Sequence, residues 1–215
     1  MKKVHIESLN KTILFDTSIK CLKFNNQLNY KEISLNLVNE IIFSINDSTV
    51  DLEKYGLIIY NPFQISLNDK KIITAMYKEL EKNCHNENNI ALIQQIESKS
   101  FELFNNLLLD FDYTFEYNEE IDLIKLFSSF NLKFTEFEYS NYVELLTNYI
   151  KLNSTFNKSK IVVSFGTLSL LSKEELILFE KELAYNDIAM LDISYVGDRI
   201  IENKDLVIDE DWCII

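Results

Sequence analysis

A strand, turn, helix and strand pattern in the last third of the sequence constrains the fold more than any other feature. Residues 161–165 are Ile-Val-Val-Ser-Phe, an apolar run typical of a strand that is buried on both faces. A turn at residues 166–167 leads to Ser172 and Glu175, which have the spacing of a helical capping box. Residues 188–193 form a second apolar run. Because a helix joins the two runs, this order predicts a β-α-β unit in a parallel sheet.

The same segment lacks the glycine-rich loop that binds phosphate in many parallel-sheet proteins. The chain has 3 glycines, which are Gly56, Gly166 and Gly197. They cannot supply the P-loop pattern or the dinucleotide-binding pattern, since both need closely spaced glycines. We expect residues 212–215 to add a third strand to the sheet. The sequence therefore predicts a nucleotide-type frame without its phosphate site, which favours a binding or assembly role over an enzyme.

The order of the predicted elements indicates a helical insertion within an α/β domain. Strands are predicted near both ends of the chain, at residues 11–15, 19–24, 32–37 and 56–60, with a short helix at 38–43. The middle is helical, with a helix that begins after Asn68 or Asp69, further helices at 89–110, 118–130 and 141–152, and a short strand at 132–135. We therefore expect an α/β head of residues 1–68 and 156–215 and an inserted helical leg of residues 69–155. The apolar stripes of the leg either form intramolecular core or pack in part against another subunit.

Charge is distributed unevenly along the chain. The formal net charge of −13 argues against nucleic acid as a partner. Residues 1–31, however, contain six Lys and only two acidic residues. This excess is either an ordinary solvated face or a basic surface within an acidic protein. If it is a basic surface, we expect Lys11, Lys20, Lys23 and Lys31 to form part of it.

Several classes of protein are disfavoured by what the sequence lacks. No apolar run approaches 18 residues, and no signal peptide follows the first methionine, so neither a membrane span nor secretion is expected. Cys21, Cys84 and Cys213 form no Cys-x-x-Cys pair, which is typical of a reduced cytoplasmic protein. Neither His5 nor His85 belongs to a recognisable hydrolase triad.

Three stretches together resemble the family of the CRISPR-associated adaptation protein Csn-two, in its short type II-A form. They are residues 57–81, residues 115–126 with 131–134, and residues 207–215. Order and spacing agree over nearly the whole chain. The resemblance implies a P-loop-like parallel-sheet head without a Walker motif and with an inserted α-helical leg. It also implies a homotetrameric ring, stabilised by calcium, that binds double-stranded DNA ends without sequence specificity in spacer acquisition, together with the CRISPR integrase proteins and the effector nuclease.

Acidic residues crowd the start of the third predicted leg helix. Glu116, Glu119, Glu120 and Asp122 offer hard oxygen ligands of the kind that calcium prefers, although their spacing is not that of an EF-hand. Acidic residues are also favoured at a helix start by the helix dipole, with no ion involved. The resemblance to this family favours a calcium site at these residues. A second acidic group, residues 209–211, is either a carboxylate pair for chemistry or a solvated turn.

Two further roles remain open at this stage. One is an interaction scaffold for the acquisition proteins that makes no direct contact with DNA, which the negative net charge favours. The other is a nucleotide-dependent enzyme of the same fold class, which the missing glycine loop disfavours.

Overall fold

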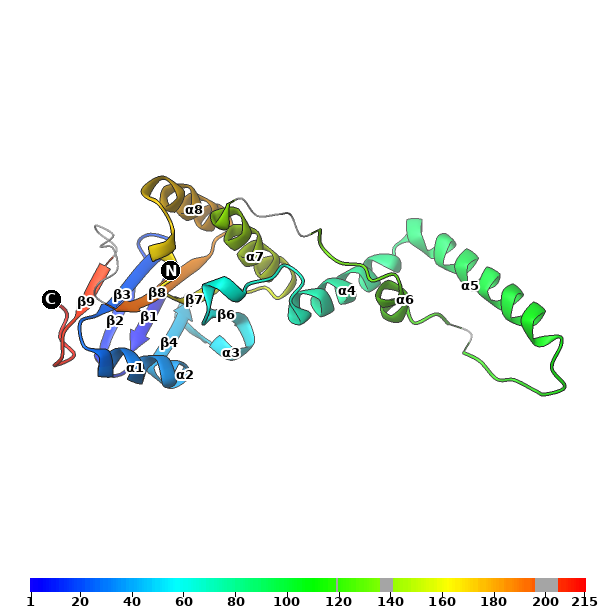
Figure 1. The fold of residues 1–215 in the computed structure, drawn as a ribbon, viewed down its shortest axis with the longest axis horizontal. Coiled ribbons are helices and arrows are strands. Elements are labelled where there is room, and N and C mark those ends of the chain that lie inside the picture. The colour runs from blue at the N-terminus through cyan, green and yellow to red at the C-terminus, as the bar shows by residue number, and fades with distance from the viewer. Residues whose placement is uncertain (119, 136–140, 196–204) are drawn as a thin grey trace. The chain divides into compact units, whose positions relative to one another are not determined.

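The computed structural model describes residues 1–118, 120–135, 141–195 and 205–215 (Figure 1). Its contacts divide the chain into two compact units. Unit 1 comprises residues 1–69 and 136–215, and unit 2 comprises residues 70–135. The chain thus leaves unit 1 once, builds unit 2, and returns.

A five-stranded parallel sheet is the centre of unit 1. Its order is β6-β7-β8-β3-β9, and its strands are β3 (Ile19–Phe24), β6 (Gly56–Ile59), β7 (Ile161–Phe165), β8 (Ala189–Tyr195) and β9 (Asp205–Ile208). Strands β7 and β8 are joined through α8 (Lys173–Tyr185), as the sequence predicts. Ser172 and Glu175 form the expected capping box at the start of α8. The α/β class and the C-terminal β-α-β unit are therefore confirmed.

A second sheet in unit 1 is antiparallel and was largely unpredicted. Its order is β2-β1-β4-β5, and its strands are β1 (Lys2–Ile6), β2 (Lys11–Leu14), β4 (Ile41–Ile45) and β5 (Ser48–Val50). Asn46 and Asp47 connect β4 to β5 with positive φ angles of 49° and 64°. Asn and Asp tolerate this left-handed backbone better than other non-glycine residues, so a tight hairpin forms without glycine.

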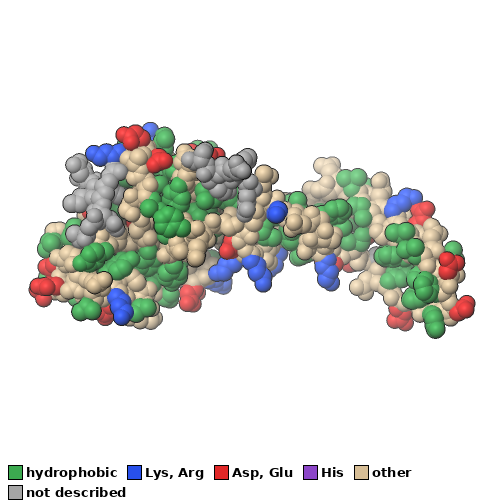
Figure 2. Space-filling view, viewed as in Figure 1, with side chains coloured by type: hydrophobic (Ala, Val, Ile, Leu, Met, Phe, Trp, Pro, Cys, Tyr) green, Lys and Arg blue, Asp and Glu red, His purple; other side chains and the backbone are tan. Residues whose placement is uncertain are grey.

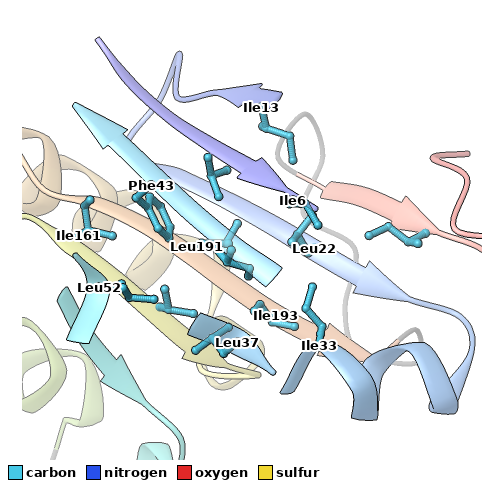
Figure 3. Close-up of a cluster of buried hydrophobic side chains, with 14 of the residues drawn as sticks. Ile6, Ile13, Leu22, Ile33, Leu37, Phe43, Leu52, Ile161, Leu191 and Ile193 are labelled. Atoms are coloured by element: carbon cyan, nitrogen blue, oxygen red, sulfur yellow. The ribbon is translucent and has the colours of Figure 1, made fainter. Parts of the chain in front are cut away.

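Two buried clusters lie on opposite faces of the parallel sheet. The first joins the two sheets, with Val4, Ile6 and Phe43 of the antiparallel sheet against Leu22, Leu191 and Ile193 of the parallel one (Figure 3). Three short helices close its margin, α1 (Gln27–Leu35), α2 (Leu37–Glu40) and α3 (Leu52–Tyr55). The second cluster packs Phe179 and Leu183 of α8 against the other face of the sheet. Unit 1 therefore has three layers, which are the antiparallel sheet, the parallel sheet and a layer of helices. Apolar side chains fill the two interfaces between these layers.

Helix α7 (Tyr142–Phe156) lies in unit 1, whereas the sequence-based leg of residues 69–155 included it. Leu146 and Ile150 are almost completely buried and belong to the cluster that contains α8 and the parallel sheet. The sequence of a helix between two strands does not indicate which unit will bury its apolar face. In this structure, the parallel sheet of unit 1 buries the apolar face of α7.

Unit 2 consists of three helices, α4 (Lys70–Cys84), α5 (Glu87–Leu108) and α6 (Leu123–Ser129). Ile72, Met76 and Tyr77 of α4 are buried, and the Tyr77 hydroxyl donates a 2.8 Å hydrogen bond to the Leu132 carbonyl. Helix α5 has 22 residues and no buried one. Figure 2 shows hydrophobic side chains at its surface.

Four sequence predictions about individual elements are wrong in whole or in part. Residues 32–37, expected as a strand, lie mostly in α1, where Asn26 caps the helix. The predicted helix at 38–43 is shorter, because its second half becomes β4. Residues 132–135 form no strand. The last strand of the parallel sheet is β9, and residues 212–215 instead turn back to make a single antiparallel bridge between Ile208 and Ile214.

No helix within the described ranges is both long enough and apolar enough to cross a membrane.

Candidate site at the carboxyl edge of the parallel sheet

Strands β3, β7 and β8 are neighbours, and their carboxyl ends lie at the same edge of the parallel sheet. In open α/β sheets, ligands bind at this edge, where loops follow the strands and helix N-termini offer unpaired N–H groups. The contacts at this edge therefore decide whether the frame is able to bind a nucleotide.

The turn after β7 directs its polar groups inward, onto a carboxylate of the protein itself. Asp192 in β8 is 2% exposed. It accepts hydrogen bonds from the backbone N–H groups of Thr167, at 3.0 Å, and Leu168, at 3.3 Å. The hydroxyl of Ser164 also donates to it. Gly166 permits the turn through a φ of 63°, which residues with a Cβ rarely adopt. A carboxylate thus occupies the place among backbone N–H groups that a phosphate would need.

A buried ion pair ties up the lysine at the end of β3. Lys23 and Asp205 of the adjacent strand β9 are 3.0 Å apart, and their side chains are 4% and 7% exposed. Removing two charges from water costs several kcal/mol per ion, so neither partner leaves such a pair readily. Cys21 lies two residues earlier on the same strand, and burial, with smaller contributions from the charges of Asp192 and Asp205, raises the pKa of its thiol. The thiol therefore stays protonated and is not a nucleophile at neutral pH.

The helix that follows β3 is capped by its own sequence. Only Asn25 and Asn26 separate β3 from α1. The Asn26 side chain accepts hydrogen bonds from the N–H groups of Leu28, at 2.7 Å, and Asn29, at 3.4 Å. A phosphate loop needs a longer glycine-rich connection and N–H groups free to reach the ligand. Neither is present at this helix start.

A tyrosine and a threonine complete the buried polar groups of this edge. The Tyr142 hydroxyl and Thr167 Oγ1 are buried and have no hydrogen-bond partner within the described part of the chain. Burial and the nearby charge of Asp192 raise the pKa of Tyr142 to about 12. Tyr142 therefore stays a neutral donor at physiological pH and has no role as a base. Among the described residues, this edge has a polar core with the carboxylates of Asp192 and Asp205 and the ammonium group of Lys23, a charge balance that disfavours a triphosphate.

Two of the four predicted DNA-facing lysines are unsuited to that role. Lys23 is buried in the ion pair with Asp205, because its position in the centre of the sheet faces inward. Lys20 pairs with Asp16 at 2.5 Å, and its side chain is only 12% exposed. Lys11 in β2 and Lys31 in α1 are exposed. The structure corrects the prediction for Lys23 and weakens it for Lys20, while Lys11 and Lys31 remain predictions.

The predicted calcium ligands are only partly described. Glu119 lies outside the described residues, and Glu116 and Glu120 are exposed. Asp122 caps α6, where its carboxylate accepts a 2.9 Å hydrogen bond from the Lys125 N–H and pairs with the Lys125 ammonium at 3.1 Å. The hydrogen bond from the Lys125 backbone is the main cause that lowers the pKa of Asp122. Among residues whose positions the structure gives, no three Asp, Glu, His or Cys side chains gather closely enough to hold a metal ion.

The second acidic group, residues 209–211, forms a turn. One oxygen of Asp209 accepts hydrogen bonds from the N–H groups of Asp211, at 3.0 Å, and Cys213, at 2.8 Å. Glu210 and Asp211 are exposed. Asp209 therefore stabilises the turn, in agreement with the interpretation of residues 209–211 as a solvated turn.

Comparisons with known proteins identify one family. The model of the family described as CRISPR-associated protein (Cas_Csn2) matches residues 38–212. A comparison with curated proteins finds no match. Among solved structures, the chain is similar to MJ1267, an ATP-binding cassette of an ABC transporter, in its ADP conformation, with 11% identity, a TM-score of 0.46, and coverage of 100% of this chain and 89% of the other. A second structure, from a study of twinning in the same cassette, has 14% identity and a TM-score of 0.45 at the same coverage.

Proposed function

Because the chain belongs to the Cas_Csn2 family of CRISPR-associated proteins, we propose that it is a non-enzymatic protein that assembles into a ring and binds the ends of double-stranded DNA during spacer acquisition. The family match spans most of the chain and gives the CRISPR association directly. The DNA-end binding, the tetrameric ring, the calcium and the place in adaptation are parts of the proposal. In it, the protein acts in the cytoplasm beside the CRISPR integrase proteins and the effector nuclease.

The contact between Asp192 and the turn after β7 carries the non-enzymatic part of the proposal. That turn is one of the places where a parallel-sheet fold would bind phosphate, and its N–H groups already hold a carboxylate of the chain. Lys23 is committed to Asp205, and the start of α1 is capped by Asn26. Three phosphate-binding devices are thus each satisfied internally within the described part of the chain, which disfavours the binding of a triphosphate and its magnesium ion.

The exposed surface of α5 supports self-assembly. This 22-residue helix has no fully buried residue, and many of its apolar side chains are exposed to water. Leu92, Leu103 and Leu107 are 56%, 54% and 58% exposed. Burial of such side chains against another copy would be favourable by about 25 cal/mol per Å² of apolar surface. We propose the homotetramer on this basis.

An acidic protein binds DNA only where its positive charges gather on one surface. Lys11 and Lys31 are exposed, as that role requires. A second set lies on α4, where Lys71, Lys78 and Lys82 are exposed. Spacings of seven and eleven residues place these three on one face of an α-helix, over a length of about 16 Å. We propose that this row of unit 2 contacts phosphates without reading the base sequence. Lys11 and Lys31 of unit 1 stay a separate prediction for phosphate contacts.

Calcium, in this proposal, binds only in the assembled protein. Glu116 and Glu120 are exposed and available as oxygen ligands, while Asp122 is already engaged as a helix cap. Calcium takes six to eight oxygen ligands, and backbone carbonyls or a second copy would have to supply the rest. An ion bound only by the assembly stabilises that assembly through mass action.

A scaffold that holds acquisition proteins without contacting DNA is the second candidate. The net charge of −13 and the engagement of Lys20 and Lys23 in ion pairs favour it. The two candidates differ in whether the purified protein binds duplex DNA by itself.

A gel shift with linear and closed circular duplex of the same sequence, in calcium and in chelator, tests the proposal. We expect linear DNA to bind better than circles, since a ring must be threaded, and we expect the affinity to fall with salt by a log–log slope of about −0.9 per phosphate contacted. The changes Lys71→Ala and Lys78→Ala together should flatten that slope by about two contacts. The matched control, Lys158→Ala with Lys173→Ala, removes two exposed lysines elsewhere and should leave the slope unchanged. Equal binding of linear and circular DNA contradicts threading, and absence of binding to either favours the scaffold.

A further inference from the structure

A row of aromatic side chains crosses unit 1 where the parallel strands end. Tyr60 follows β6 and stacks on Phe165, the last residue of β7, with ring centroids 5.4 Å apart and planes at 9°. Tyr30 of α1 contacts Phe165 and also Tyr195, the last residue of β8, at 6.5 Å in each case. The row has no part in the polar site described above.

The strand register explains why these rings meet. Ile59 pairs with Ser164, so the next residues, Tyr60 and Phe165, lie beside each other on the same face of the sheet. Tyr195 pairs with Phe24 in β3, and Phe24 contacts Tyr30 at 6.4 Å. The aromatic residues therefore extend across four strand ends on the face that α1 partly covers.

Much of this aromatic area faces solvent. Tyr60 is 62% exposed and Tyr195 is 44% exposed. Phe63, three residues after Tyr60, is 76% exposed, and Leu28 of α1 is 74% exposed. We call Leu28, Tyr30, Tyr60, Phe63, Phe165 and Tyr195 the aromatic surface. The four rings of Tyr30, Tyr60, Phe165 and Tyr195 form a connected row, and exposed apolar surface of this kind is typical of an interaction site.

The aromatic surface is acidic at its β9 end, where the C-terminal turn lies, and Lys31 is exposed beside Tyr30 in α1. The Asn29 side chain in α1 donates hydrogen bonds to the carbonyls of Asp209, at 3.1 Å, and Glu210, at 3.2 Å, and so holds the C-terminal turn against the helix. Trp212 of this turn contacts Phe24 edge-on, with ring centroids 5.8 Å apart, which extends the aromatic row to the turn. The exposed carboxylates of Glu210 and Asp211 therefore lie at the β9 end of the row, whereas Tyr60 lies at its β6 end.

The charge at the β9 end of the aromatic surface decides between the two chemistries that stack on aromatic rings. Nucleobases stack on tyrosine, but their phosphates would meet the carboxylates of Glu210 and Asp211. Arginine and lysine also bind over aromatic faces, and the same carboxylates attract them. Residues 205–215 contain no Lys or Arg that would neutralise these carboxylates from within the segment.

We propose that the aromatic surface binds a segment of another protein that carries arginine or lysine, with one cationic group over Tyr195, on the side of Glu210 and Asp211, and another over Tyr60 at the β6 end of the row. This interaction requires no DNA and uses none of the lysines assigned to DNA above. It gives the protein a docking site for a basic partner on unit 1. Since it does not involve α5, it is also separate from the proposed contact between copies.

The test measures binding of a fluorescent (Arg-Gly)4 peptide to the full chain by anisotropy, with (Glu-Gly)4 and a dT12 oligonucleotide as comparison probes. Tyr60→Leu with Tyr195→Leu keeps apolar bulk but removes the ring faces, and should weaken (Arg-Gly)4 binding about fivefold or more, since each exposed cation–π contact is worth roughly two- to fivefold. Tyr60→Phe with Tyr195→Phe keeps the rings and should bind within about twofold of the parent. Glu210→Gln with Asp211→Asn should weaken binding and reduce its dependence on salt.

Matched controls separate this site from general attraction to an acidic protein. Tyr185→Leu changes a tyrosine that is 89% exposed at the end of α8, and Glu53→Gln with Glu174→Gln removes two exposed acids elsewhere. Both should bind (Arg-Gly)4 like the parent. The proposal is overturned if Tyr60→Leu with Tyr195→Leu binds (Arg-Gly)4 like the parent, or if dT12 is the probe whose binding this double variant loses. Loss of self-association by the double variant would also overturn it, because the surface would then be a contact between copies. Binding of linear duplex DNA is measured for the same double variant. If the double variant retains this binding, the result for (Arg-Gly)4 tests the docking proposal separately from the proposed DNA binding.

Discussion

The two units of the chain bury their apolar residues in opposite ways. In unit 1, Phe179 of α8 is 0% exposed and lies in a cluster with side chains of the parallel sheet and α7. In unit 2, α5 is the longest helix of the described chain and has no fully buried residue. Hydrophobic burial is the main favourable term in folding, so we expect unit 1 to contribute most of the stability of the chain. We propose that the exposed apolar surface of unit 2 binds other copies of the chain.

The largest predicted effect comes from the core of unit 1. Phe179→Ala should lower the free energy of unfolding by about 3–5 kcal/mol, because the cavity that it leaves lies between the sheet and α7. Leu178→Ala, at an adjacent position that is 60% exposed, is the matched control and should cost far less. Urea unfolding followed by circular dichroism measures both. Equal losses for the two variants would mean that unit 1 does not hold the core of the chain.

The buried carboxylate should give the next largest effect. Asp192→Ala leaves the Ser164 hydroxyl and the N–H groups of Thr167 and Leu168 without their acceptor, and should cost about 1–3 kcal/mol of unfolding free energy. Asp192→Asn keeps one oxygen acceptor and should cost less. Urea midpoints of the two variants provide the comparison, and a neutral Asp192→Ala would show that the turn does not depend on this carboxylate.

Sequence reasoning located the elements of unit 1 whose patterns are strongest. Strand β7, the capping box of α8 and the absence of a phosphate loop follow from local residues. The antiparallel sheet was mostly missed, because β1 and β4 are short and their connections rely on Asn and Asp at positive φ rather than on glycine. Strand β9 was missed because residues 212–215 looked more apolar and were predicted as the third strand, while the partner of β9, β3, lies far away in sequence.

The site residues were harder to predict than the fold. Lys23 was grouped with other lysines by sequence distance, yet its place in β3 turns it toward Asp205, which is remote along the chain. Asp192 could have been recognised as a site residue, since a carboxylate inside an apolar strand must have hydrogen-bond partners when it is buried. Its partners in the turn after β7 could not be identified without knowing that β7 and β8 pair. Contacts between copies leave no local pattern beyond an apolar helix face, and α5 has that pattern.

The smallest effect concerns the start of α6 in unit 2. Hydrogen bonding and the ammonium of Lys125 lower the pKa of the Asp122 carboxyl in the folded chain below its ordinary 3.8. A lowered folded pKa means that the stabilisation is present above the unfolded pKa and is lost as the pH falls through the folded value. Asp122→Ala should slightly lower the melting temperature at pH 7, and the difference from the parent should shrink as the pH falls below 3.8 and through the lowered folded pKa. Asp122→Asn, which still caps, is the control. A difference between parent and Asp122→Ala that grows as the pH falls would contradict this assignment.

Sedimentation velocity tests most directly whether unit 2 exists to join copies. The parent chain, with a monomer mass of 25.3 kDa, should sediment at micromolar concentration as a species of about four times that mass, more completely with calcium than with chelator. Leu103→Lys with Leu107→Lys places charges on the exposed face of α5 and should shift the protein to monomer, while its circular dichroism spectrum stays that of the parent. Ile177→Lys, a change at a 55% exposed position on α8 in unit 1, should leave the assembly intact. A parent that remains monomeric with and without calcium, or an α5 variant that assembles like the parent, would contradict the account.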